Sequence, residues 1–129
     1  MKTILICGAT GFIGRNLLDY YSKKNYKIKA THFKRSPVEG YPNVEWIKCD
    51  LRNPSDIKHA LRGVDIVMQF AATTTGAKDI VSKPYIHVTD NAVMNSLLLR
   101  ESFEQGIENF IFPSCTIMYQ KSETALKET

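Results

Sequence analysis

Short apolar runs alternate along the chain with longer stretches in which apolar residues recur at helical spacing. The runs predict strands over residues 3–7, 27–31, 44–49, 65–70 and 108–112. The stretches between them predict helices over residues 12–24, from Asn53 to about Gly63, and over residues 85–105. Strands that alternate with helices form a parallel sheet with right-handed crossovers and helices on both faces. We therefore expect an α/β chain, a Rossmann-type doubly wound parallel sheet with strand order 3-2-1-4-5, in one domain over residues 1–129.

Local signals support the first two predicted helices. The inner side of the first helix is predicted from apolar residues at helical spacing, namely Ile13, Leu17, Leu18 and Tyr21. The second helix begins at Asn53-Pro54-Ser55-Asp56, in which asparagine is a good N-cap, proline suits the first helical position and an acid lies in the first turn. The region over residues 36–43, which contains two prolines and a glycine, is predicted to be a loop.

A glycine-rich turn joins the first predicted strand to the first predicted helix. Its sequence is Cys7-Gly8-Ala9-Thr10-Gly11-Phe12-Ile13-Gly14. Two glycines let the backbone turn tightly and approach a pyrophosphate, and the third lets helix and strand pack closely. The unpaired N–H groups of the helix then face the anion. A turn without a ligand is the alternative, but the strand before it and the helix after it favour a dinucleotide site formed by Gly8, Thr10, Gly11, Phe12, Ile13 and Gly14.

The end of the second predicted strand bears on which dinucleotide is bound. Proteins that choose NAD usually carry an acid here, which binds the ribose 2′-hydroxyl. This chain has Thr31-His32-Phe33-Lys34-Arg35 instead, with two cations and no carboxylate. Such a segment accommodates the 2′-phosphate of NADP, so NADP is favoured over NAD, with His32, Lys34 and Arg35 as candidate contacts. The alternative is that both cations are only solvated.

Candidate contacts also follow the third and fourth predicted strands. Asp50, next to Leu51, is suited either to accept a hydrogen bond from the adenine amino group or to cap the turn that follows. Phe70, Ala71 and Ala72 place small residues where a ring and a ribose must approach the backbone, although close packing alone also selects alanine.

Further candidates lie in the third predicted helix and after the fifth strand. Asn91 is a mediocre helix former, which favours a role for its amide next to the fourth strand; solvent exposure is the alternative. Ser114, Cys115 and Thr116 place hydroxyls and a thiol where a substrate would meet the nicotinamide, and a polar turn is the alternative there.

Composition narrows the class of protein. The chain is 43% hydrophobic and 23% charged, as in ordinary globular proteins, and no segment is long enough to span a bilayer. Three cysteines without metal-ligand spacing are typical of reduced thiols, so we expect a cytosolic protein with no metal and no membrane partner. The net charge is +4, and no base-stacking aromatics accompany the basic residues, so no nucleic-acid partner is expected. Lys23, Lys24, Lys27 and Lys29 are interpreted as solvated lysines.

Several motifs together resemble those of the extended short-chain dehydrogenase/reductase family, which includes nucleotide-sugar epimerases, dehydratases and reductases. The motifs are the glycine turn over residues 8–14, Cys49-Asp50-Leu51-Arg52, Gln69-Phe70-Ala71-Ala72, Asp90-Asn91 and the stretch over residues 110–119. The part from Val64 to Lys121 looks most like relatives of GDP-fucose synthase. The resemblance implies hydride transfer between a sugar carbon and the nicotinamide, with a nucleotide sugar as substrate. It also implies a homodimer through the helix over residues 85–105, whose Leu97, Leu98 and Leu99 are apolar on more than one side. The alternative is that missing C-terminal elements cover some of this surface in the longer protein.

Two features depart from the family pattern. Counting back from Tyr119, the position of the family's substrate-binding hydroxyl falls on Cys115, a weaker hydrogen-bonding group, so Ser114 or Thr116 is the alternative. The family's general acid/base tyrosine is followed four residues later by a lysine, and here only Tyr20 and Lys24 have that spacing. They lie in the first helix, which runs away from the cofactor, so we do not expect them to be the catalytic pair.

These features predict the N-terminal part of a longer enzyme, truncated after the fifth strand and inactive as given, because the chain reaches Thr129 without the family's catalytic pair. The alternative is a non-catalytic domain that binds NAD(P) as a sensor and acts through a protein partner, for which Cys115 would be suitable. A tyrosine and a lysine four residues apart, about 20–30 residues beyond Tyr119 in the parent reading frame, would favour the enzyme.

Overall fold

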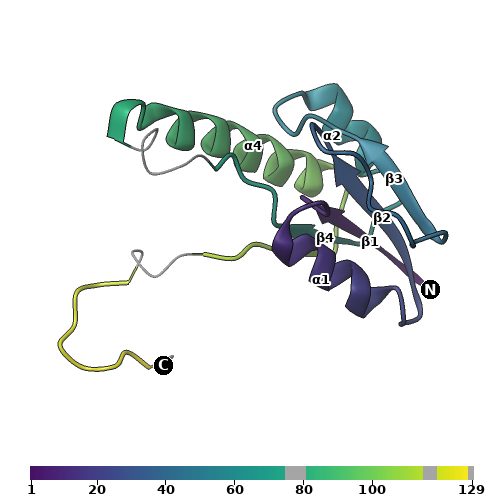
Figure 1. Cartoon of the computed structure of the whole chain (residues 1–129), viewed down its shortest axis with the longest axis horizontal. Coiled ribbons are helices and arrows are strands. Elements are labelled where there is room, and N and C mark those ends of the chain that lie inside the picture. Colours follow the sequence, from purple (N-terminus) through teal and green to yellow (C-terminus); the bar gives the residue numbers. More distant parts are fainter. Residues whose placement is uncertain (75–80, 115–118, 128–129) are drawn as a thin grey trace.

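The computed structural model of the chain describes residues 1–74, 81–114 and 119–127. The strands are β1 (Lys2–Cys7), β2 (Tyr26–His32), β3 (Val44–Lys48), β4 (Ile66–Gln69) and β5 (Asn109–Ile111). The helices labelled in Figure 1 are α1 (Phe12–Tyr21), α2 (Pro54–Ala60) and α4 (Tyr85–Glu104). All strand pairs are parallel, and the order across the sheet is β3-β2-β1-β4-β5. The predicted Rossmann-type fold and its strand order are therefore confirmed.

Strand β1 lies in the middle of the sheet and contributes to a core on each face. Its side chains alternate, so that Ile4 and Ile6 belong to one buried cluster while Leu5 and Cys7 belong to the other. All four are fully buried, as expected for the central strand of a parallel sheet covered on both sides. The glycine turn therefore follows a strand that is anchored in both hydrophobic clusters.

Helices cover the sheet on both sides, as Figure 1 shows. Helix α1 lies on one face, where Leu18 packs in the cluster of Ile4 and Ile6. Helices α2 and α4 lie together on the other face, where Ile57 and Leu98 join the cluster of Leu5. None of the helices in the described part of the chain combines the length and the apolarity needed to cross a membrane.

Helix α1 corrects one part of the predicted pattern. Ile13 was expected on the inner side, but it is 51% exposed, whereas Gly14 and Leu18 are the buried residues of this helix. Gly14 takes the inner position and lets the helix approach closely. Successive residues of an α-helix are about 100° apart around its axis, so Ile13 points outward. The helix is also shorter than predicted, ending at Tyr21.

Lys29 was expected to be solvated, and this prediction is wrong. Its side chain is buried on the face of the sheet that α2 covers, with Nζ donating to the main-chain oxygen of Arg62 at 2.8 Å and lying 3.6 Å from a carboxylate oxygen of Glu45. Arg62 follows α2, so the ammonium satisfies a carbonyl group just beyond the C-terminal end of that helix. Lys23, Lys24 and Lys27 are exposed as predicted.

The start of α2 follows its sequence signal. The side chain of Asn53 accepts a hydrogen bond from the main-chain N–H of Ser55 at 2.9 Å, and Pro54 is the first helical residue. The N-cap and the proline therefore have the predicted roles.

Candidate functional site

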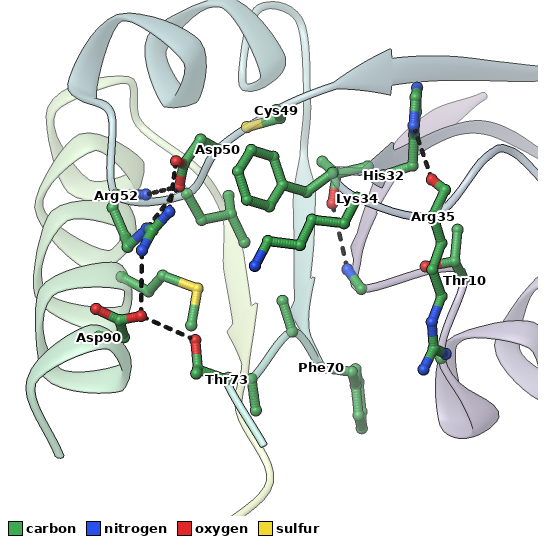
Figure 2. A pocket seen from close by; sticks show the side chains of 18 of the residues that line it. Thr10, His32, Lys34, Arg35, Cys49, Asp50, Arg52, Phe70, Thr73 and Asp90 are labelled. Carbon is green, nitrogen blue, oxygen red and sulfur yellow. Dashed lines mark hydrogen bonds and ion pairs between the residues drawn. The ribbon is translucent and has the colours of Figure 1, made fainter. Parts of the chain in front are cut away.

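A crevice of about 470 Å³ lies at the carboxyl ends of the strands. Loops after β1, β2, β3 and β4 line it, together with one side of α4, as the close view in Figure 2 shows. Its lining residues are Gly8, Thr10, Gly11, Thr31, His32, Phe33, Lys34, Arg35, Cys49, Asp50, Leu51, Arg52, Phe70, Ala71, Ala72, Thr73, Thr74, Asp90 and Met94. In an open α/β sheet, ligands bind at this edge, where the chain leaves β1 and β4 in opposite directions. The crevice lies within the size range of small-molecule sites.

The glycine turn forms one wall of the crevice, and its geometry requires glycine at two positions. Gly8 has a φ of +73°, and a Cβ there would lie 2.7 Å from both N and Cα of Ala71. A Cβ on Gly14 would lie 2.3 Å from the main-chain oxygen of Gly8. The turn is closed by a hydrogen bond from the N–H of Gly11 to the same oxygen at 2.9 Å. Adding any side chain at Gly8 or Gly14 would therefore displace backbone.

The first turn of α1 is open to an anion. Gly11 is its N-cap and supplies no side-chain hydrogen bond, and the first turn contains no acidic residue. The N-terminal end of α1, which is the positive end of the helix dipole, therefore has neither a capping side chain nor a first-turn acid to neutralise it. Thr10 lines the crevice beside this end, whereas the predicted contacts Phe12, Ile13 and Gly14 are not among its lining residues.

The segment after β2 holds the two predicted cations. In Figure 2 the Lys34 side chain extends into the middle of the crevice, while Arg35 lies on the side of Thr10. His32 makes a 3.1 Å hydrogen-bond contact between Nδ1 and the main-chain oxygen of Arg35, which closes the local turn. Just before them, the buried Thr31 accepts a hydrogen bond on its hydroxyl from the N–H of Gly8 at 3.2 Å. That contact joins the β2 end to the glycine turn and was not predicted from the sequence.

After β3, the carboxylate of Asp50 is held by Arg52. Oδ1 accepts from Arg52 Nε and from its main-chain N–H, each at 3.0 Å, and Oδ2 accepts from Nη2 at 2.9 Å. These hydrogen bonds lower the pKa of Asp50, to which the ammonium of Lys34 also contributes. Asp50 thus caps the turn, as one of its two predicted roles required, and it lines the crevice together with Leu51.

After β4, a buried amide holds the backbone that faces the crevice. Gln69 is 1% exposed, and its side chain donates to the oxygen of Ala71 at 3.0 Å and to Oδ1 of Asn95 at 2.8 Å. It also accepts from the N–H of Ala71 at 3.3 Å. Phe70, Ala71 and Ala72 line the crevice as predicted. The sequence analysis used Gln69 only as part of a motif and missed its role, although a glutamine ending an apolar strand was the available signal.

Asn91 acts through its amide next to the fourth strand, as predicted. It does not line the crevice, although its helix neighbours Asp90 and Met94 do. Its amide instead holds the main chain of Thr73, accepting from the N–H at 2.8 Å and donating to the oxygen at 3.1 Å. Solvent exposure, the alternative, is wrong, because the residue is partly buried. Asn91 therefore shapes the loop after β4 from behind.

Of the predicted substrate-orienting residues, only Ser114 can be placed. It follows β5 and is not among the residues that line the crevice. Cys115 and Thr116 lie outside the described residues. Tyr20 and Lys24 do not line the crevice either; the ammonium of Lys24 lies 5.0 Å from the centroid of the Tyr20 ring, in a cation–π contact. This agrees with the prediction that they are not the catalytic pair.

Two thiols lie near the crevice and are poor nucleophiles. Cys7 and Cys49 are free and buried, and burial raises the pKa of both, that of Cys49 to about 12. In the part of the chain that the structure describes, no group of three His, Cys, Asp or Glu side chains is placed to hold a metal ion.

Comparisons with known proteins agree with this geometry. The model of the NAD dependent epimerase/dehydratase family matches residues 4–129. The chain is 29% identical over 90% of its length to N-acetyl-alpha-D-glucosaminyl-diphospho-ditrans,octacis-undecaprenol 4-epimerase of Escherichia coli O157:H7, and 28% identical over 98% to GDP-L-fucose synthase of Azorhizobium caulinodans. It covers 33% and 38% of those two proteins, so it spans about a third of their length.

A solved structure shows the same fold. The UDP-Glc/GlcNAc 4-epimerase of Campylobacter jejuni superposes with a TM-score of 0.82 at 21% identity, covering 96% of this chain and 40% of that one. At this identity the likeness concerns the fold alone.

Proposed function

The chain belongs to the NAD-dependent epimerase/dehydratase family, and from this premise we propose that its crevice binds a dinucleotide, with NADP preferred over NAD. We further propose that the protein is the nucleotide-binding part of an epimerase, dehydratase or reductase that acts on a nucleotide sugar. When bound, the dinucleotide supplies hydride chemistry at its nicotinamide. The protein's part is to bind and orient, which the crevice residues can do.

The observation that carries the dinucleotide is the open start of α1 beside a turn that excludes side chains. Gly8 and Gly11 line the crevice without side chains, so the turn offers bare backbone there. The helix beyond it has neither a capping side chain nor a first-turn acid. Exposed N–H groups at the positive end of a helix are the features that a pyrophosphate requires. The residues present therefore fit a dinucleotide.

Support for NADP comes from the end of β2. Lys34 and Arg35 both line the crevice, and the segment over residues 31–35 carries no carboxylate that would bind a free 2′-hydroxyl. Arginine and lysine beside each other can hold a phosphate by a planar fork and a point charge. On this proposal the two cations contact the 2′-phosphate directly.

Thermal unfolding in NADP and in NAD at equal concentrations tests the preference. We expect NADP to raise Tm more than NAD, because a ligand that binds only the native state stabilises it in proportion to its affinity. Replacing both cations, Lys34→Gln with Arg35→Gln, should remove this difference. The expected loss of NADP affinity is roughly tenfold or more, since hydrogen bonds to charged groups contribute about 1.5–3 kcal/mol.

A control variant that removes the same number of positive charges is available outside the crevice. Lys23→Gln with Lys24→Gln removes two exposed lysines that do not line the crevice, and it should leave both Tm shifts unchanged. A larger shift with NAD would reverse the preference. No shift with either dinucleotide would refute the site itself.

We also propose that the protein forms a homodimer through α4. The outward side of this helix carries Tyr85, Val88, Leu99 and Phe103, which are 55–87% exposed and lie on one side at helical spacing. Exposed apolar residues at both ends of this side of the helix are suited to a contact between subunits. Light scattering of the parent protein is expected to give twice the monomer mass, and the Phe103→Arg variant should be a monomer.

Tyr20→Arg is the control for this variant, because it changes an exposed aromatic residue on α1 and should leave the dimer intact. If the parent protein is a monomer at high concentration, the proposed dimer is excluded.

A further inference from the structure

Arg52 connects the two sides of the crevice. It follows β3, whereas Asp90 belongs to α4, which follows β4, and β2 and β1 lie between those strands in the sheet. Its Nη1 donates to Oδ2 of Asp90 at 3.1 Å while Nη2 and Nε hold Asp50, as the dashed lines in Figure 2 show. The guanidinium therefore bridges one end of the crevice, and both carboxylates that it contacts belong to residues that line the crevice.

The bridge continues into the loop after β4. Asp90 Oδ2 also accepts from the hydroxyl of Thr73 at 3.4 Å, and Asn91, the next residue of α4, holds both main-chain groups of Thr73. Arg52 thus contacts α4, and α4 fixes the loop that forms the opposite wall of the crevice. A displacement of the guanidinium would be transmitted to Thr73 through Asp90.

The charges at this end depend on Arg52. Asp50 and Asp90 both line the crevice, and the guanidinium lies between their carboxylates. Without it, like charges would face each other across a partly desolvated space, which disfavours their present separation. Lys34 offers one further cation near Asp50, but a single ammonium lacks the planar fork that serves two carboxylates at once. The guanidinium also makes a cation–π contact with Phe33, whose ring centroid is 5.7 Å away.

The ion pairs of Arg52 with Asp50 and Asp90 are partly exposed to solvent, which favours a role in positioning over a role in stability. The side chains of Arg52, Asp50 and Asp90 are 39%, 27% and 30% exposed. Ion pairs as wet as these contribute little to the free energy of unfolding. A preformed wall, by contrast, raises affinity because the ligand does not have to order it.

We propose that Arg52 is a positioning residue of the dinucleotide site: by holding Asp90 it fixes the start of α4 and the main chain around Thr73 against the crevice before the ligand arrives. The inference rests on the proposed function for the identity of the ligand, but the bridge and its effect on Thr73 exist without one. The proposal requires that Arg52 contribute to dinucleotide affinity through its contact with Asp90, and not solely by touching the ligand.

A double-mutant cycle on the full chain tests this requirement. Arg52→Gln and Asp90→Asn should each weaken dinucleotide binding about tenfold by calorimetry, and the double variant should be no weaker than either single variant. Arg52→Lys should restore the affinity only in part. The urea midpoint should change little in all of them, which a merely structural role would not produce.

Hydrogen exchange without ligand provides the second measurement. The amide of Thr73, bonded to Asn91, should exchange faster in Arg52→Gln and in Asp90→Asn than in the parent. The matched control is the exposed ion pair between Lys2 and Glu108, which does not line the crevice; Lys2→Gln should alter neither affinity nor exchange at Thr73.

The outcomes separate the two proposals. Additive losses of affinity, a normal affinity for Asp90→Asn, or unchanged exchange at Thr73 would each overturn the role of Arg52 while leaving the dinucleotide site in place. A parent chain that binds neither NADP nor NAD would overturn the proposed function, and exchange at Thr73 would still decide whether the bridge fixes the wall.

Discussion

Replacing Gly8 with alanine is expected to destabilise the protein by about 3 kcal/mol or more and to abolish dinucleotide binding. Two costs combine at this position. The φ of +73° is unfavourable for any residue with a Cβ, by about 1–2 kcal/mol. The added methyl would also lie 2.7–2.8 Å from main-chain atoms of Ala71 and Phe70, and overpacking of this kind costs about 1–3 kcal/mol. Urea unfolding and calorimetry measure the two effects.

Gly63 is the matched control for the backbone conformation. It has a φ of +67°, and nothing lies within 4 Å of the position of its Cβ. Gly63→Ala should therefore cost only the conformational part, about 1–2 kcal/mol, with binding unchanged. If the two alanine variants lost the same stability and bound equally well, the close approach of the first and fourth strand ends would have no energetic consequence.

The second large effect is expected for Gln69→Leu. The substitution keeps a side chain of similar size but leaves the N–H and the oxygen of Ala71, and Oδ1 of Asn95, without their partner. A buried polar group left unsatisfied costs about 1–3 kcal/mol, so we expect a loss of about 3 kcal/mol in the free energy of unfolding. Dinucleotide affinity should fall as well, because Ala71 lines the crevice.

Gln105→Leu is the comparison for this change. Gln105 makes one long side-chain hydrogen bond, 3.4 Å to the main-chain oxygen of Lys58, at a more exposed place. Its replacement should change stability by less than about 0.5 kcal/mol. Equal losses in the two variants would show that the leucine itself, and not the buried hydrogen bonds, is responsible.

The fold was predictable because its signals are local. Buried parallel strands are continuous apolar runs, as Ile4-Leu5-Ile6 illustrates, and the alternation of strands with helices limits the order of the sheet. Asn53 and Pro54 mark the start of α2 by interactions within a few residues. The glycine turn was identified for the same reason, since its spacing and both flanking elements are contiguous in the sequence.

The polar contacts were less predictable because their partners are distant in the sequence. Lys29 is neutralised and hydrogen-bonded by groups on β3 and after α2, so its burial depends on the assembled sheet. Arg52 and Asp90 are 38 residues apart, and nothing in the local pattern of either one indicates the other. Asn91 was correctly singled out as unusual in a helix, but only the position of the loop after β4 shows that its amide holds Thr73. Such pairings are properties of tertiary structure.

The segment over residues 33–35 belongs to neither hydrophobic core, and its side chains are exposed. If Lys34 and Arg35 set coenzyme preference as proposed, mutations there should leave folding almost untouched, so coenzyme choice could drift during evolution without a compensating change elsewhere. The cradle at Gly8 has no such freedom, because its neighbours are main-chain atoms. Among descendants of this sequence, coenzyme preference should therefore diverge sooner than the capacity to bind a coenzyme at all.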